Sequence, residues 1–210
     1  MRKILLLAVV LVLSACQSAY YGAAEKMGYH KRDILVDRVE ASTEAQQDAE
    51  KQFRSALEEL SVLVDFDGGD LQAVYESLAD EYEDAEDAAG VVRERIDAVD
   101  NVARALFDEW REEIEQYSNA RLKADSEAKL RETRRRYDDM ITAMRKSEAK
   151  MDPVLAALKD NVLYLKHNLN ARAVSSLKVE FAAIREEIEA LISEMRRAIA
   201  SSDEFIASME

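Results

Sequence analysis

Cys16 is the residue best suited to covalent chemistry, and it is the only cysteine in the chain. A single cysteine excludes an intramolecular disulfide. Arg2 and Lys3 come first, and a ten-residue apolar run, 4–13, separates them from the Ser14-Ala15-Cys16 sequence. Such a run is too short to span a bilayer comfortably and is typical of a targeting segment. The N-terminus therefore predicts export.

The Leu13-Ser14-Ala15-Cys16 sequence resembles the lipobox of bacterial lipoproteins, in which the cysteine is lipidated and becomes the new N-terminus. The resemblance implies that residues 1–15 are a removed signal peptide and that residues 16–30 are the lipidated cysteine and a tether. An aspartate after the cysteine typically keeps such proteins in the inner membrane, but here that residue is Gln17. The resemblance therefore implies anchoring in the outer membrane, facing the periplasm. The alternative is an ordinary secretory signal with a chance cysteine.

The remaining polar residues predict no active site. A di-iron site in a helical bundle needs Glu-x-x-His pairs, but Met27 precedes His30 by three residues and Tyr164 precedes His167 likewise. Two histidines and one acylated cysteine are too few for a usual zinc site. Glycine-rich phosphate loops and nucleophile elbows are also absent from the sequence. We therefore expect no enzyme, no catalytic or metal-binding residue and no cofactor.

The charge of the chain is strongly acidic. The formal charge is -14, which argues against nucleic acid as a partner. Seven acids fall within 76–87, where a solvated helix face is favoured over a site for cations or a basic partner. Asp65, Asp67 and Asp70 surround Gly68-Gly69, where a turn with Asp70 as helix N-cap is favoured over an ion site.

Long helices must position these residues, because the chain has only five glycines and one proline. We predict helices over about 33–64, 71–117 and 126–168, with a weaker break at 118–125. A turn at Asn168-Leu169-Asn170-Ala171 comes next, and a fourth helix follows it to the C-terminus. Apolar residues repeat every three or four positions through the second helix, as expected for a helix that packs against others. Its twelve core positions are Leu71, Tyr75, Leu78, Tyr82, Ala85, Ala89, Val92, Ile96, Val99, Ala103, Leu106 and Trp110. The first helix has a polar interruption at Ser42 and Gln46.

These patterns predict an all-α protein: an elongated up-down-up-down antiparallel helical bundle with coiled-coil-like heptad seams, forming one domain over residues 31–210. The second and third helices should form a hairpin whose tip overhangs the others, with Pro153 near the level of Gly90. We prefer a kink at Asp152-Pro153 to a new helix there, and expect both helices to bend at that level. Arg134 should pair with Glu109 or Glu113.

Two surfaces leave alternatives open. The basic run 131–136 pairs with acids of the second helix or touches anionic lipid headgroups, and we favour the pairing. Trp110 is the candidate partner contact, since tryptophan is common at binding hot spots. Packing against Tyr29 or the last helix is the favoured alternative for it. The aromatic tether before His30 is a spacer or docks on the bundle.

Three stretches carry a family resemblance: Gly28–Val36 (GYHKRDILV), Leu106–Trp110 (LFDEW) and Leu163–Ala171 (LYLKHNLNA). With the lipobox and the helical pattern, they resemble an uncharacterised family of proteobacterial lipoproteins known only as a domain of unknown function. The resemblance covers essentially the whole mature chain and implies a helical, coiled-coil-like envelope protein. It implies no active-site residue.

We therefore expect a lipid-anchored cell-envelope protein with a structural or protein-interaction role. Its expected partners are the membrane, through the lipid, and either an unknown envelope protein or a second copy of the chain. The alternative is a periplasmic binding module, in which the bundle encloses a hydrophobic ligand or its acidic end holds a divalent cation.

Overall fold

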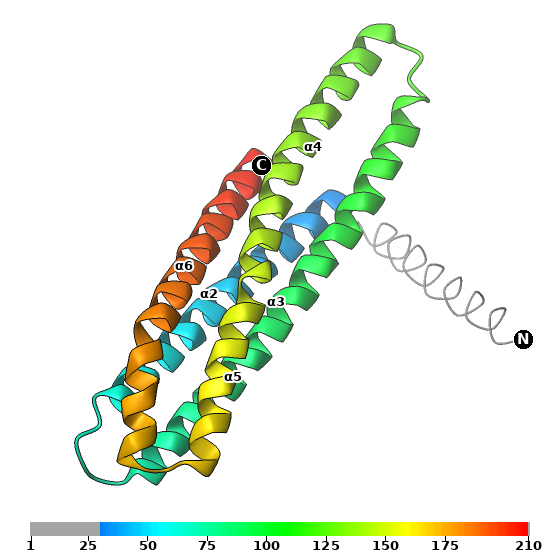
Figure 1. Ribbon diagram of the computed structural model, residues 1–210. Helices are drawn as coiled ribbons and strands as arrows, with labels where there is room; N and C mark the ends of the chain where they lie inside the picture. The colour runs from blue at the N-terminus through cyan, green and yellow to red at the C-terminus, as the bar shows by residue number, and fades with distance from the viewer. Residues whose placement is uncertain (1–29, 210) are drawn as a thin grey trace, which may run out of the picture.

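Residues 30–209 are described by a computed structural model, and every regular element among them is an α-helix (Figure 1). The helices are α2 (Lys31–Val64), α3 (Leu71–Ile114), α4 (Ala120–Ala149), α5 (Met151–His167) and α6 (Ala171–Met209). Because α4 and α5 follow one another along a single rod, the helices make four antiparallel rods in an elongated bundle. The predicted all-α bundle is confirmed.

Polar caps set the helix boundaries. The Asp70 carboxylate accepts a hydrogen bond from the Ala73 amide at 3.2 Å, as predicted for an N-cap, and Gly69 adopts a positive φ of 119° in the preceding turn. The Asn119 side chain caps α4 by accepting from the amides of Arg121 and Leu122 at 3.0 and 3.2 Å. The predicted start of this helix at Ser126 was therefore six residues too late, because the cap at Asn119 was overlooked.

The predicted core positions are buried along most of the bundle. All nine in α2 are at most 1% exposed: Leu35, Val39, Ser42, Gln46, Ala49, Phe53, Ala56, Leu60 and Leu63. In α3 the predicted positions are buried from Leu78 to Ala103, and Phe107 and Ile114 then replace Leu106 and Trp110 as the buried residues. The buried face of α3 thus shifts by one residue where α2 and α6 no longer cover it on both sides.

The third rod is interrupted at Lys150, between α4 and α5. Pro153 lacks the amide that would bond the carbonyl of Ala149. Lys150 keeps right-handed helical angles (φ -85°, ψ -13°), so the same face remains buried on both sides, through Met144, Met151 and Leu158. The helix predicted over 126–168 is therefore two helices, α4 and α5, although the apolar register continues across the break between them. The helix α3 is unbroken at Gly90.

Core packing includes one polar layer, in the middle of the bundle. The Ser147 hydroxyl lies 3.3 Å from the Gln46 Oε1 atom and 2.8 Å from the Met144 carbonyl oxygen. Gln46, Ser147 and the neighbouring Ser42 are fully buried, and the Nε2 atom of Gln46 has no hydrogen-bond partner among the described residues. Because a buried polar pair is satisfied in only one alignment of its helices, this layer favours one register of α2 against α4.

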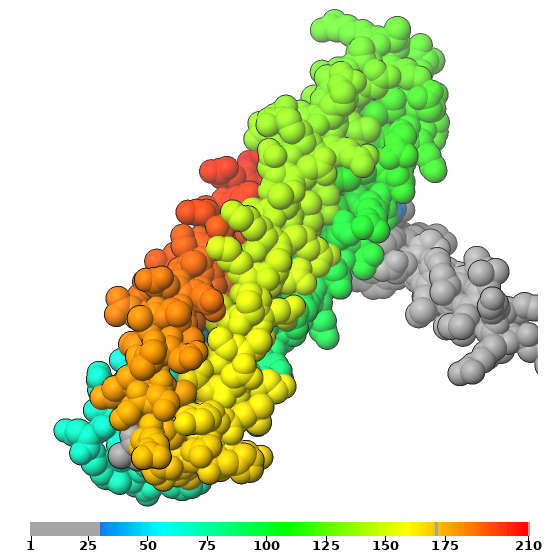
Figure 2. All heavy atoms as spheres, viewed as in Figure 1, coloured from blue at the N-terminus to red at the C-terminus, as the bar shows by residue number. Residues whose placement is uncertain are grey.

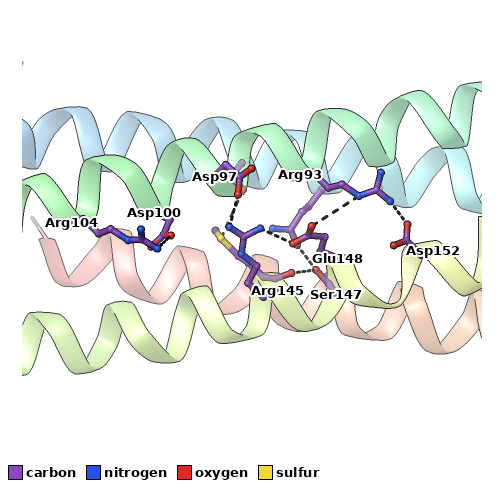
Figure 3. Close-up of polar contacts among 11 residues, drawn as sticks. Arg93, Asp97, Asp100, Arg104, Arg145, Ser147, Glu148 and Asp152 are labelled. Atoms are coloured by element: carbon purple, nitrogen blue, oxygen red, sulfur yellow. Dashed lines mark hydrogen bonds and ion pairs between the residues drawn. The ribbon is translucent and has the colours of Figure 1, made fainter. Parts of the chain in front are cut away.

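Ion pairs lie on the surface of the bundle at the level of this polar layer. Figure 3 shows those between α3 and the third rod. Arg145 of α4 contacts Asp97 of α3 at 2.5 Å and Glu148 at 2.9 Å, while Arg93 bonds Asp152 beyond the helix break. The Arg93–Asp152 contact confirms that the Gly90 region faces the Pro153 region.

The opposite side of this level is held by Glu194 of α6. Its side chain is only 10% exposed and lies 3.0 Å from Lys146, 3.6 Å from Lys150 and 3.0 Å from Arg197. The hydrogen bond from Lys146 and the surrounding cations lower the pKa of Glu194. The charged side chains thus join α6 to α4 and to the junction at Lys150.

The hairpin of α3 and α4 extends beyond the start of α2 and the end of α6 (Figures 1 and 2). The predicted overhang is therefore confirmed. Within residues 30–209, no helix is both long and apolar enough to cross a membrane.

Replacing Gln46 by methionine should stabilise the protein. A methionine keeps a similar length and removes the unpartnered amide, whose burial costs about 1–3 kcal/mol. Ser147 keeps its bond to the Met144 carbonyl. Urea unfolding of Gln46→Met should therefore give a higher free energy of unfolding than the wild type. The control is Gln47→Met, at the exposed neighbouring position, which should change stability little. An equal change in stability for both substitutions would show that the buried, unpartnered amide of Gln46 does not destabilise the protein.

Replacing Glu194 by glutamine should destabilise the protein at neutral pH but not in acid. Since the pKa of Glu194 in the folded protein lies below that of an ordinary glutamate, the ionised carboxylate stabilises the fold at neutral pH, and this contribution is lost as the pH falls through the lowered pKa. Melting temperatures of wild type and Glu194→Gln should therefore differ at pH 7 and converge in acid. Glu189→Gln, in a 57% exposed pair with Arg185, is the control. A pH-independent difference would refute this assignment.

Candidate functional site

A cleft lies where the α3–α4 hairpin leaves the rest of the bundle. It has a volume of about 860 Å³ and is open to solvent on one side. Its walls come from all four rods, since α2 starts and α6 ends there. The lining residues are Arg32, Leu106, Glu109, Trp110, Glu113, Ala128, Lys129, Glu132, Thr133, Arg136, Ser208 and Met209.

Trp110 lies between α3 and α4 in this cleft. Its indole nitrogen donates a hydrogen bond to the Ser126 hydroxyl at 2.9 Å. The residue is half-buried, and Leu106, one turn earlier, is half-buried beside it on the cleft wall. The hydrogen bond therefore fixes one edge of the indole ring, and the rest of the ring is accessible from the cleft.

Next to the cleft, an aromatic cluster packs between α3, α4 and α6. The Tyr137 ring meets Phe107 and Phe205 edge-on, with centroids 5.4 and 6.3 Å away. The Tyr137 hydroxyl donates to Asp100 at 2.8 Å, and burial together with this carboxylate raises its pKa. Edge-to-face rings of this kind pack firmly. The cluster therefore supplies a rigid base beside the cleft.

Arg134 takes part in this cluster and not in the predicted ion pair. Its guanidinium lies 5.9 Å from the centre of the Phe107 ring, a cation–π distance, and the residue is exposed. The expected pairing of the basic run with acids of α3 is also wrong, because Arg135 and Arg136 pair with Glu132 of their own helix. Pairs spaced three and four residues apart are the nearest partners on a helix surface.

The cleft carries balanced charge. Arg32, Lys129 and Arg136 lie among its residues together with three glutamates. Lys31 at the start of α2 bonds Glu109 at 2.8 Å and is 11% exposed, so this pair fastens α2 to α3 at the edge of the cleft. In residues 30–209, no three acidic, histidine or cysteine side chains are grouped closely enough to hold a metal. The arrangement is suited to non-covalent binding of an amphipathic surface or ligand.

Of the predicted site residues, the structure places Trp110 in the cleft. Leu13, Ser14, Ala15 and Cys16 lie outside the described residues. The structure joins two of the three stretches that carry the family resemblance, since Lys31 of the first bonds Glu109 of the second. Ser126 was missed as the partner of Trp110, although a hairpin turning near residue 118 sets 110 opposite 126.

A comparison with protein families matches residues 20–209 to a family described as a protein of unknown function, DUF2959. The chain belongs to this family. The match begins ten residues before His30 and so includes the aromatic segment that precedes α2. No curated protein and no solved structure matches the chain.

Replacing Ser126 by alanine should loosen Trp110. Because Trp110 is the only tryptophan, its fluorescence reports on the cleft alone. Without the hydroxyl acceptor, the indole N–H must turn to water, so we expect a red-shifted emission and stronger quenching by acrylamide. The control is Ser118→Ala in the exposed turn of the same hairpin, which should leave both readings unchanged. Unchanged fluorescence in Ser126→Ala would show that the hydrogen bond does not hold the ring.

Proposed function

We propose that this protein is a lipid-anchored envelope protein that binds a protein partner through the Trp110 cleft. The observation that carries the proposal is the position of this cleft. It lies at the end of the bundle where the chain enters α2, 14 residues after Cys16, so an acylated Cys16 would hold it near a membrane. Acyl chains on one cysteine anchor a protein stably when two or more are present.

The composition of the cleft supports a protein partner. It offers a half-buried tryptophan surrounded by charged side chains of both signs, which matches the pattern of an aromatic anchor with a polar rim. The ends of α2 and α6 hold its shape through the Lys31–Glu109 pair and Met209, which is 6% exposed. A preformed surface of this kind loses little conformational entropy on binding.

The second candidate function is binding of a hydrophobic ligand, which the volume of about 860 Å³ favours. Such a ligand would lie in the open cleft and not inside the bundle, where the rods pack through buried side chains such as Phe53, Ile96 and Met144. A lipid that copurifies with the protein, and that mass spectrometry no longer finds after Leu106→Glu, would favour this function.

Photo-crosslinking in whole cells tests the proposal. A photoreactive residue in place of Trp110 should give a discrete product with another envelope protein, and the same residue in place of the 82% exposed Val179 should not. In parallel, wild-type protein should incorporate an alkynyl fatty acid that Cys16→Ala does not, and the Trp110 product should diminish in Cys16→Ala.

Three outcomes would contradict parts of this proposal. Equal products from Trp110 and Val179 would show that the cleft has no special role. Products with a second copy alone would make it a self-association surface. Absence of fatty-acid labelling would refute the anchor.

A further inference from the structure

We propose that the tip of the α3–α4 hairpin contacts the bilayer surface in which the protein is anchored. The inference rests on the anchor at Cys16 proposed above and adds a second, non-covalent contact. The tip consists of residues 115–124, which join α3 to the first turn of α4.

The tip exposes apolar side chains that the bundle does not use. Tyr117 is 44% exposed and Leu122 is 52% exposed, although both lie next to ordered helix ends. Ala120 and Ala124 beside them are exposed as well. Tyrosine is favoured at the boundary between headgroups and hydrocarbon, and a leucine that enters this layer leaves water.

The charge of the tip differs from that of the whole chain. The protein has a formal charge of -14, whereas residues 115–124 contain one acid, Glu115, and two bases, Arg121 and Lys123. Lys123 bonds Glu115 at 2.7 Å, while Arg121 has no ion-pair partner among residues 30–209. An acidic body is repelled by anionic headgroups, so a mildly basic tip is the part that approaches them at least electrostatic cost.

The geometry brings the tip to the surface. The Lys31–Glu109 pair places the start of α2 level with Glu109, and α3 continues past this level to Ile114, roughly 8 Å at 1.5 Å per residue, before the turn that leads to α4. The 14 residues from Cys16 to His30 span at most about 50 Å when fully extended. This length exceeds the overhang of the hairpin, and the tip is the part of the bundle that extends farthest at the end where the chain enters (Figure 1).

Tryptophan quenching by lipid tests the contact. The mature chain, residues 16–210, would be coupled through its single thiol to a maleimide phospholipid in vesicles of phosphatidylethanolamine and phosphatidylglycerol. In a Trp110→Phe background, Leu122→Trp reports on the tip. Leu163→Trp is the matched control, because Leu163 is 49% exposed near the opposite end of the rod.

Doxyl-labelled lipid should quench most of the emission of the Leu122→Trp variant and shift the remainder to the blue, and the Leu163→Trp variant should be unaffected. Adding Arg121→Glu should reduce the quenching at the tip. Equal quenching of both variants, quenching of the Leu163→Trp variant alone, or no quenching would each overturn the inference. Since maleimide coupling replaces natural acylation, these failures concern the tip alone, whereas a failure of fatty-acid labelling in cells concerns the anchor.

Discussion

The register of α2 against the third rod is the constraint on which the other features of the bundle depend. An apolar seam alone is compatible with several alignments, because one leucine layer packs against another almost as well at the next turn. Gln46 and Ser147 remove this freedom, since a slipped register would bury both without the contact they make. At the same level Arg145 pairs with Asp97 of α3 and Lys146 pairs with Glu194 of α6, so the ion pairs join α4 to the other two rods where the buried layer joins it to α2.

The register also determines which helices end where. With α2 starting level with Glu109, the bundle has four rods up to the Trp110 cleft and only two beyond it. The hairpin beyond that level has little core to hold it together. Charged pairs near this end of the hairpin include Lys123 with Glu115 at 2.7 Å and Lys129 with Asp125 at 3.0 Å. Exposed pairs of this kind each contribute a few tenths of a kcal/mol.

Periodicity predicted the fold where each rod has partners on all sides. Every core position assigned to α2 is buried, and the Asp70 cap and the Asn168–Ala171 turn lie as expected. It failed at the hairpin. The heptad pattern continued through Leu106 and Trp110, but near the ends of α2 and α6 the buried face of α3 turns toward Phe107 and Ile114. The spacing of apolar residues indicates which face of a helix is apolar. Which residues of that face are buried in the core and which line the cleft depends on how the helices pack.

The same reasoning explains why Trp110 could be identified as a candidate while its surroundings could not. A tryptophan at the end of a seam is visible in the sequence, but Ser126, Met209 and Arg32 come from three other helices and share no motif with it. Their convergence depends on where the helices begin and end: α2 starts at Lys31 and α6 ends at Met209, while the α3–α4 hairpin continues to the cap at Asn119. The cleft therefore exists because α2 and α6 stop before α3 and α4 do. In this protein the unequal lengths produce the cleft and the bare hairpin tip together, and both lie at the end where the chain enters the bundle. The membrane anchor that we propose at Cys16 would therefore act on both at once, because it would keep the cleft and the tip on the side of the bundle nearest the membrane.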